Sequence, residues 1–338
     1  MLRRLLILTL AVSCLLFALP AFAQDVQQGE ITAASPTAEF EVDLEAGTSF
    51  MVVIQGADTL SPLLFLYAPS GGIVEHANTI GGETSAYLMH KVDTSGTYRV
   101  RVRGAEASEG TFQLLTESIA PAPAALVADT LPYSEIPQSR GVDGAFILGD
   151  PDAPITLIEF ADWVCPHCVD YHPAMDQFIL DYVATGQAKF EFRLFPTAGG
   201  QLTALMGALA ECADIAQPGS FWEAHALFYH YAETGLYNSL VAFRSIEALN
   251  LDIDVMNTCV STATQWQTDM QFGRDHGING TPAVLIRYGA GEPEWVTHNG
   301  VTYDQGAPAY DVLTAVIEEA QNRPEATEEA TAEATTQP

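Results

Sequence analysis

The sequence predicts two folded domains, an all-β domain followed by an α/β domain. Three observations support this fold class. Residues 26–117 consist of short segments of partly alternating hydrophobicity, separated by Gly, Pro and Asp turns. Residues 155–164 form a β-branched and aromatic run that leads directly into Cys-Pro-His-Cys at 165–168. Helical periodicity then dominates from 199 to about 273.

Length, composition and charge limit the function classes. A chain of 338 residues with 48% hydrophobic residues is long enough for one to three domains with full cores. Its formal net charge of −30 argues against nucleic acid and anionic membrane surfaces as partners. We interpret the acidic surface as a source of solubility rather than as a site for a basic partner.

The N-terminus has the pattern of a secretory signal. Arg3 and Arg4 precede an apolar run over 5–19, and Ala-Phe-Ala at 21–23 fits a small-x-small cleavage site. Residues 1–23 are therefore predicted to be a signal peptide. The mature protein is then exported to the periplasm, the cell envelope or the extracellular space. Because the apolar run is short for a spanning helix, an uncleaved N-terminal anchor is only the second interpretation.

The first domain, residues 26–117, is predicted to be a β-sandwich. The expected strands are 38–44, 49–55, 63–67, 85–92 and 97–103. The segments at 40–47, 93–102 and 110–114 resemble the bacterial pre-peptidase C-terminal (PPC-like) β-sandwich. No catalytic constellation stands out here, so an accessory or binding module is expected.

Two segments are predicted to lie outside the domains. Residues 118–140 are rich in Pro and Ala and predict a semi-rigid linker. Residues 323–338 are acidic and of low complexity, which predicts a disordered tail because such a segment has little to bury.

The chemistry is concentrated at Cys-Pro-His-Cys, residues 165–168. The run before it predicts a buried strand, and the apolar residues after it recur at helical spacing. The two cysteines then lie at a strand-to-helix junction, in the first turn of the helix. There, unpaired N–H groups and the helix dipole stabilise a thiolate on the first cysteine. A Cys-x-x-Cys pair in this position is a dithiol/disulfide couple.

The rest of the second domain, residues 141–322, alternates strands and helices. Residues 188–195 predict a strand after the first helix, and the helical insertion follows. A further strand is predicted over 280–286, with 294–298 as its hairpin partner. A helix that begins near Tyr310 closes the domain.

The second domain closely resembles the thioredoxin superfamily, and within it the DsbA-like thiol:disulfide oxidoreductases. The resemblance spans nearly all of 141–322 and rests on Cys-Pro-His-Cys, the helical insertion, and Gly-Thr-Pro at 280–282 before a β-run. It implies a thioredoxin fold with a helical insertion and an activity as a protein disulfide oxidase that needs no metal or organic cofactor. It also implies a membrane quinone-linked partner that reoxidises the protein.

The resemblance implies roles for individual residues. Cys165 matches the exposed nucleophile and Cys168 the buried resolving thiol, and together they form the redox-active disulfide. His167 matches the histidine that stabilises the Cys165 thiolate, and a stabilised reduced form makes the disulfide a stronger oxidant. Glu159 matches a buried acid that assists proton transfer near Cys168.

Two further residues are implied on the substrate side. Pro282 matches a cis-proline that faces the disulfide, and a cis X-Pro bond is rare enough to be a deliberate feature. Thr281 matches the residue before it, whose backbone pairs with an extended substrate.

Each assignment has an alternative. The cysteine pair could be half of a zinc site or an inert disulfide, although no second ligand pair follows at suitable spacing. His167 could be an ordinary exposed histidine, Glu159 a surface residue at a strand end, and Pro282 a trans proline. The histidines at 172, 225, 230, 276 and 298 are expected to be structural or solvated.

Cys212 and Cys259 both fall in the helical insertion. Without Cys14 of the predicted signal peptide, four cysteines remain. Since an even number of cysteines in an exported chain favours disulfides, we predict that Cys212 and Cys259 form a structural disulfide. It would close a long loop and could contribute roughly 4 kcal/mol in the chain-entropy model. Two buried free thiols are the alternative.

The function predicted from these features is that of an exported oxidoreductase that introduces disulfides into secreted or envelope proteins. Its substrates are reduced proteins with free thiols. The first alternative keeps the fold but reverses the direction, giving a disulfide reductase or isomerase. The more distant alternative is a binding or adhesion protein that acts through the β-sandwich.

Overall fold

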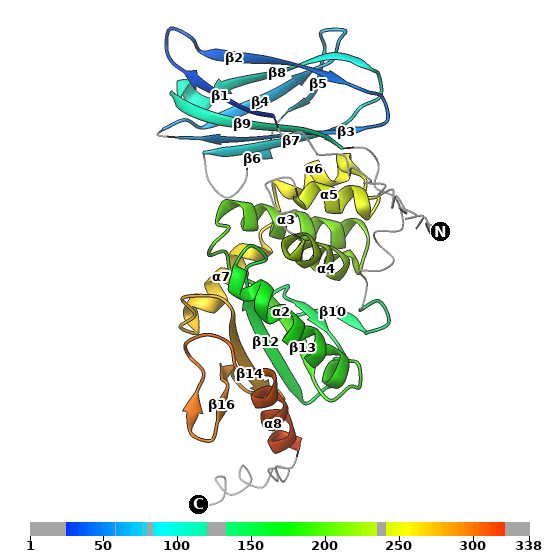
Figure 1. Ribbon diagram of the computed structural model, residues 1–338, viewed down its shortest axis with the longest axis vertical. Helices are drawn as coiled ribbons and strands as arrows, with labels where there is room; N and C mark the ends of the chain where they lie inside the picture. Colours follow the sequence, from blue (N-terminus) through cyan, green and yellow to red (C-terminus); the bar gives the residue numbers. More distant parts are fainter. Residues whose placement is uncertain are drawn as a thin grey trace, which may run out of the picture.

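The computed structural model describes residues 25–57, 59–76, 78–79, 84–119, 133–234 and 241–321. The predicted signal peptide, the middle of the predicted linker and the predicted acidic tail lie outside these residues. A sandwich of strands occupies one end of the molecule, a layer of helices the middle, and a second sheet the other end (Figure 1). Within the described ranges, no helix combines the length and the apolar character needed to cross a membrane.

The first domain is a sandwich of two antiparallel sheets. The five-stranded sheet has the order β1-β9-β3-β7-β6, with β1 at Asp25–Ile31, β9 at Gly110–Ile119, β3 at Ser49–Gly56, β7 at Ser85–Lys91 and β6 at Asn78–Thr79. The four-stranded sheet has the order β2-β8-β4-β5, with β2 at Thr37–Leu44, β8 at Gly96–Gly104, β4 at Pro62–Tyr67 and β5 at Ile73–His76. A short 3₁₀ turn, η1 at Ala105–Ala107, follows β8.

Alternation along the strands builds the sandwich core. In β3, Val52 and Ile54 are completely buried between the sheets, together with Leu88 of β7 and Val100 of β8. The intervening residues of β3 then lie on the outer face of the five-stranded sheet, because successive side chains point to opposite faces. The predicted all-β fold of this region is confirmed, with the five expected strands present as β2, β3, β4, β7 and β8.

The second domain is built on a mixed sheet. Its order is β10-β11-β13-β12-β14-β15, with β10 at Gln138–Arg140, β11 at Phe146–Leu148, β13 at Lys189–Leu194, β12 at Ile155–Ala161, β14 at Ala283–Tyr288 and β15 at Glu294–Trp295. The central strand β12 is parallel to β13 and antiparallel to β14. A two-stranded ribbon follows, with β16 at Thr297–His298 and β17 at Val301–Thr302.

Helices cover both faces of this sheet. On one face lie α2 at Pro166–Phe178, continued by the π-helical turn η2 at Ile179–Val183, and α8 at Tyr310–Gln321. On the other face, Phe272 of α7 at Gln265–Asp275 packs against Phe160 of β12. Because all seven residues of β12 are buried between these layers, the strand carries a nearly continuous apolar run.

Two sequence expectations differ from the structure at strand ends. The predicted linker, 118–140, contributes strand residues at both ends, since β9 runs to Ile119 and β10 begins at Gln138. The predicted hairpin partner, 294–298, is divided. Its first two residues pair with β14, while Thr297 and His298 pair with β17. Two-residue strands carry too little periodicity for a sequence pattern to assign their partners.

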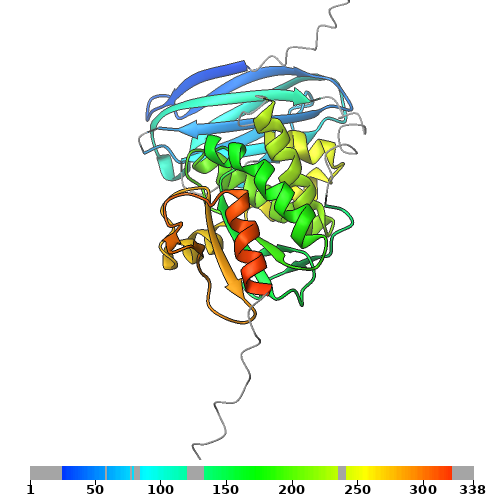
Figure 2. The ribbon, with the colours of Figure 1, turned by 60° about the horizontal axis from the view of Figure 1, so that its bottom comes forward.

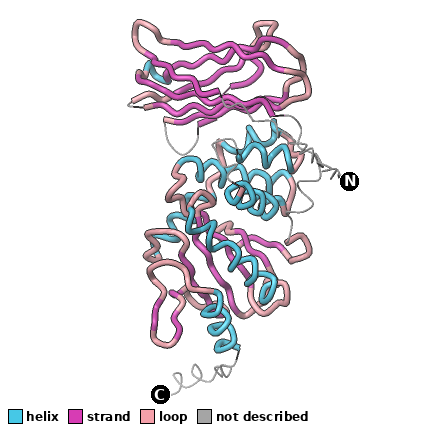
Figure 3. Tube along the Cα trace, in the orientation of Figure 1, coloured by secondary structure: helices cyan, strands magenta, loops and turns pink. Residues whose placement is uncertain are grey.

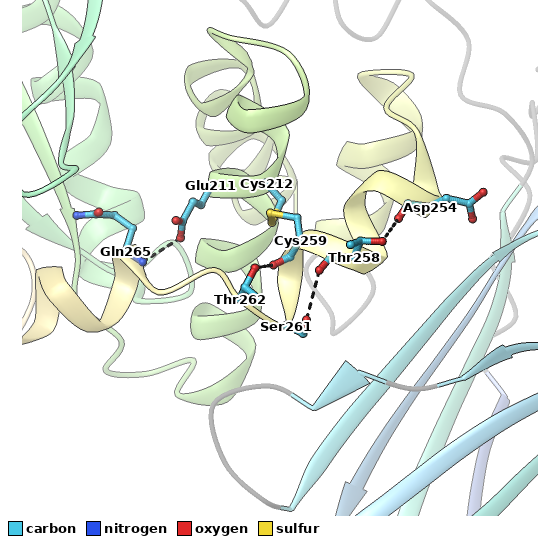
Figure 4. The surroundings of a disulfide bond; sticks show 8 residues. All are labelled: Glu211, Cys212, Asp254, Thr258, Cys259, Ser261, Thr262 and Gln265. Carbon is cyan, nitrogen blue, oxygen red and sulfur yellow. Dashed lines mark hydrogen bonds between the residues drawn. A yellow bond between two sulfur atoms is a disulfide. The ribbon is translucent and has the colours of Figure 1, made fainter.

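The predicted helical insertion contains α3 at Gln201–Ala216, α4 at Ser220–Glu233, α5 at Val241–Ala248 and α6 at Ile253–Val260, with α7 after them. Cys212 of α3 and Cys259 of α6 form a disulfide, with an S–S distance of 2.01 Å across 47 positions of sequence (Figure 4). Next to it, the Gln265 N–H donates to the Glu211 carboxylate at 2.9 Å and joins the start of α7 to α3.

The sandwich rests on this insertion. Both views of the ribbon place α3, α5 and α6 between the five-stranded sheet and the second domain's sheet (Figures 1 and 2), and the tube shows the same order of layers (Figure 3). Met51, Tyr87 and Met89 of the outer sheet face belong to the same buried apolar cluster as the second domain's core. A buried ion pair crosses the interface, from Arg244 of α5 to Glu117 of β9 at 2.9 Å. The two domains therefore share one apolar interface.

Candidate active site

Strand β12 delivers the two cysteines to the start of α2. Cys165 is the N-cap residue, with φ −70° and ψ 120°, and Pro166 occupies the first helical position. Proline suits this position because it has no N–H to leave unpaired and disfavours helical dihedrals in the residue before it. The Cys165 carbonyl accepts the N–H groups of Cys168 at 2.9 Å and Val169 at 3.1 Å. The first turn of α2 thus starts on Cys165 itself.

The two thiols differ in their access to solvent. Cys168 is completely buried, as the resemblance implies for a resolving thiol. Cys165 is only 6% exposed, whereas Pro166 and His167 beside it are exposed. The expectation of an exposed nucleophile is therefore wrong for this dithiol form, in which the Thr281 carbonyl lies 3.5 Å from the Cys165 sulfur. Both cysteines are free thiols here, so the structure describes the dithiol form and their disulfide stays a prediction.

The loop before β14 faces these thiols. The Thr281–Pro282 peptide bond is cis. The Cys165 thiol donates to the Thr281 carbonyl at 3.5 Å, and Pro282 is buried. The Thr281 side chain also acts on the Cys168 thiol, whose pKa it lowers. The structure therefore brings together the two cysteines with Thr281 and Pro282, all of which the sequence singled out. The two pairs lie more than a hundred positions apart in the sequence.

Glu159 lies beneath the thiols in the centre of β12. It is 1% exposed, so the alternative that it is a surface residue is wrong. Burial, reinforced by the charge of Asp176, raises the pKa of Glu159 to about 8. Among the described residues its Oε1 atom has no hydrogen-bond partner. A carboxyl group in this setting holds a proton at neutral pH.

Glu159 influences the protonation of Cys168. Burial is the main cause that raises the pKa of the Cys168 thiol, and the nearby charges of Glu159 and Cys165 raise it further. Hydrogen bonds from the Asp162 N–H, at 3.4 Å, and from Thr281 act in the opposite direction. The protonated form of Cys168 is therefore favoured in this structure.

Asp162 is a buried residue of the site that the sequence analysis did not single out. It is fully buried directly after β12, and its carboxylate accepts hydrogen bonds from the loop 197–200 and from the first turn of α3. These donors are the Thr197 N–H at 2.7 Å, the Gly199 N–H at 3.0 Å and the Thr203 hydroxyl at 2.6 Å. The Val164 N–H donates to it at 2.8 Å. Asp162 therefore ties that loop to the residue before Cys165.

A second link joins the same loop to the cis-proline loop. The hydroxyl groups of Thr197 and Thr281 are 2.8 Å apart and share a hydrogen bond. An acidic residue three positions before the first cysteine was the one available signal for this network. Its partners could not be found from the sequence, because no periodic pattern connects Asp162 with Thr197.

The histidines occupy two kinds of environment. His167 is exposed next to the thiols. His172 and His225 are buried, and burial lowers the pKa of both. His225 accepts a hydrogen bond from the Trp163 indole at 3.3 Å, and the His172 ring stacks on Tyr229 with 3.7 Å between ring centres. These two neutral imidazoles pack the layer between β12, α2 and α4.

Comparison with known proteins finds relatives of the second domain. Residues 142–289 match the family described as Thioredoxin. Disulfide bond formation protein D of Bacillus subtilis is 28% identical over 179 residues, which cover 48% of this chain and 74% of that protein. Na(+)/H(+) antiporter NhaA 3 of Salinispora tropica is 33% identical over 147 residues, 43% of this chain. The chain spans only 22% of that antiporter's length.

Two solved structures are similar to this chain. The α-DsbA1 structure of Wolbachia pipientis has a TM-score of 0.45 at 23% identity, covering 54% of this chain and 92% of that chain. The BdbD structure of Bacillus subtilis has a TM-score of 0.41 at 20% identity, covering 52% and 91%. With the family match and the relative named for disulfide bond formation, the predicted resemblance to DsbA-like thioredoxin-fold oxidoreductases is confirmed for the second domain. The PPC-like resemblance of the sandwich stays a prediction.

Proposed function

We propose that this chain, whose second domain is a DsbA-like thioredoxin-family domain, is an exported enzyme that introduces disulfides into secreted or envelope proteins. One observation supports this above the others. Cys165 caps the N-terminus of α2 and faces the Thr281 carbonyl at 3.5 Å, with Cys168 buried one turn behind it. The arrangement leaves one sulfur for attack and protects the other.

The exchange runs in two balanced steps from the oxidised form. A substrate thiolate attacks the Cys165 sulfur, the bond between Cys165 and Cys168 breaks, and a mixed disulfide forms at Cys165. A second substrate thiolate then attacks the substrate sulfur of that mixed disulfide, and Cys165 leaves as a thiolate. The substrate loses two electrons and gains a disulfide, and the enzyme takes up both electrons as a dithiol.

The protein groups around the sulfurs have distinct tasks. The N–H groups of the first turn of α2 favour negative charge on Cys165 when it leaves. Because the pKa of the buried Cys168 thiol is raised, its sulfur takes up a proton after it leaves, and Glu159 supplies that proton. During reoxidation the Glu159 carboxylate accepts the proton back. His167, exposed in the first turn, adds positive charge near Cys165 when it is protonated.

The loop that contains the cis peptide bond between Thr281 and Pro282 orients the substrate. In the dithiol form the Thr281 carbonyl accepts the Cys165 thiol, so this backbone lies where an extended substrate would pass the sulfur. A proline at 282 adds no N–H that would need a partner there. Reduced proteins with free thiols are the proposed substrates, and a membrane quinone-linked protein is the proposed partner for reoxidation.

The decisive experiment is the reduction potential of the Cys165–Cys168 couple. The full mature chain is equilibrated in glutathione buffers, and the redox state of the peptide that contains both cysteines is followed by alkylation and mass spectrometry. This readout leaves the Cys212–Cys259 disulfide intact. A reduction potential of about −120 mV would identify a thiol oxidase, whereas a reduction potential of about −270 mV would identify a reductase. A Cys165→Ser variant must lose all thiol oxidation.

Export is tested separately. N-terminal sequencing of the protein from the envelope and medium fractions should show a chain that begins at Gln24, directly after the predicted cleavage site. A chain that retains residues 1–23 would instead support the N-terminal anchor.

A further inference from the structure

We propose that the N-terminal sandwich forms one wall of the site that binds the substrate polypeptide. The wall belongs to a groove between the two domains, which we call the seam groove. Its volume is about 340 Å³, and it is lined by Val53, Gln55, Ser85 and Ala86 of the sandwich and by residues 197–202 and Leu205 of the second domain. This inference rests on the proposed thiol:disulfide exchange at Cys165 and adds the region that selects its substrates.

Thr197, which lines the seam groove, is linked to the reacting sulfur through Thr281. The Thr281 carbonyl is 3.5 Å from the Cys165 sulfur, and the Thr281 hydroxyl is 2.8 Å from that of Thr197, which lines the groove. Gly199, which also lines the groove, packs against the residue before Cys165. A Cβ atom there would lie 2.3 Å from Val164 Cγ2, so only glycine fits between the groove and the residue before Cys165. A polypeptide that reaches Cys165 past Thr281 therefore lies at the mouth of this groove.

Gln55 and Ser85, the polar residues of the sandwich that line the groove, belong to a row of uncharged polar side chains. In the strand register Gln55 of β3 lies opposite Ser85 of β7 on one side and opposite Gln113 of β9 on the other. Gln113 lies opposite Gln28 of β1, and the three glutamines are exposed. The Ser85 hydroxyl donates to the side-chain oxygen of Gln201, at the start of α3. The row thus crosses the outer sheet face and ends against the second domain.

The lining indicates the chemistry of the occupant. None of the residues that line the seam groove is charged, although the chain as a whole carries a formal charge of −30. Amide and hydroxyl groups at Gln55, Ser85 and Gln201 can pair with a peptide backbone, while Val53 and Leu205 offer apolar contact. A charged side chain would lose its water here without gaining a partner. The groove therefore fits an extended segment of uncharged residues beside the substrate's reacting cysteine.

The wall is held in place before any substrate binds. Besides the ion pair between Arg244 and Glu117, the Asn257 side chain donates to the Met89 carbonyl at 3.0 Å across the interface. These contacts, with the shared apolar cluster, fix the outer sheet face relative to Cys165. A prebuilt wall gains affinity because little conformational freedom is lost on binding.

The test uses the full mature chain with Gln55→Trp, which fills the seam groove from an exposed position. The matched control is Gln321→Trp, the same replacement at the exposed end of α8. The KM for a reduced two-cysteine peptide with uncharged flanks should rise about tenfold in Gln55→Trp, because the bulky ring removes the contact surface. Its kcat, its oxidation of dithiothreitol and its unfolding midpoint should match those of the control.

The outcomes separate two failures. If the wild-type chain does not oxidise dithiothreitol, the proposed function fails. If dithiothreitol is oxidised normally but Gln55→Trp has the control's KM for the peptide, the seam groove is not the binding site. Peptides with Asp or with Lys flanks should both react about tenfold more slowly with the wild-type chain, since neither charge finds a partner. Faster reaction with Lys flanks would show attraction to the acidic surface instead and would overturn the proposal.

A crosslinking measurement covers the case in which Gln55→Trp does not fold. A photoreactive benzoylphenylalanine is placed at position 55 or, as control, at 321, in a Cys168→Ala chain that traps the mixed disulfide at Cys165. The trapped peptide should crosslink at 55 and not at 321. Absence of that crosslink, or a crosslink from 55 to a second copy of the chain, contradicts the assignment of the groove to substrate.

Discussion

Replacement of Glu159 by Gln should stabilise the second domain at alkaline pH and not at acidic pH. The variant keeps the shape of the side chain but removes its titration. In the folded chain burial raises the pKa of Glu159 from 4.5 to about 8. Between those two values the folded protein retains a proton that the unfolded chain has released. The contribution of Glu159 to the free energy of unfolding must therefore fall as pH rises through this window, and it levels off above about pH 8.

The size of the effect follows from the width of that window. A shift from 4.5 to about 8 corresponds to about 5 kcal/mol of lost stability above pH 8, on the order of a third to a whole of a domain's total stability. Glu159→Gln removes this loss. The difference between variant and wild type should thus grow by several kcal/mol between pH 5 and pH 9, whatever its value at pH 5.

Tryptophan fluorescence offers a domain-specific assay. All 4 tryptophans lie in the second domain, so their emission during denaturant unfolding reports on that domain. Both proteins are unfolded in urea at pH 5 and pH 9 with Cys165 and Cys168 reduced. Titrating groups that Glu159 does not influence, such as the buried Asp269, act equally in both proteins and cancel from the difference. An unchanged difference between the two pH values would refute the argument that Glu159 is held protonated by burial.

Three further changes test the framework of the site and the interface. Asp162→Ala leaves the buried N–H donors of the loop after β13 without an acceptor and should cost about 3 kcal/mol, seen as earlier urea unfolding and as new protease cleavage near residue 199. The double variant Cys212→Ala with Cys259→Ala should lose about 4 kcal/mol in denaturant unfolding, and a loss below about 1 kcal/mol would contradict the chain-entropy argument. Glu117→Gln weakens the buried pair with Arg244 and should destabilise the docked sandwich by about 3 kcal/mol, measured by hydrogen exchange of β9 against an exposed Glu→Gln control on β2.

Much of the architecture could be predicted because it depends on local patterns. Period-two hydrophobicity and Gly, Pro and Asp turns identified the strands of the sandwich. A continuous apolar run identified β12, and its direct junction with Cys-Pro-His-Cys placed both cysteines in the first turn of a helix. Spacing along one segment carries this information, so no distant contact is needed to extract it.

Strand β13 is an element whose burial cannot be predicted from its local sequence pattern. Glu191 and Arg193 suggest a polar, solvated face, yet each is 2% exposed. Arg193 pairs with Glu191 at 2.6 Å and with Asp269 of α7 at 3.1 Å. Covering by α7 turns the polar face of the strand into a buried ion network. The sequence cannot show this, because the partner lies more than seventy positions away.

The sequence by itself determined that two cysteines lie at the start of a helix, that a proline precedes a β-run, and that the chain divides into an all-β and an α/β region. These depend on residue types and on spacings of a few positions. Only the tertiary structure decided that Glu159 is buried, that Asp162 anchors the loop after β13 and the first turn of α3, and that the sandwich and residues 197–202 line one groove. Each of these depends on which distant surfaces pack together. That is set by the sum of many weak contacts across the whole chain rather than by any local pattern.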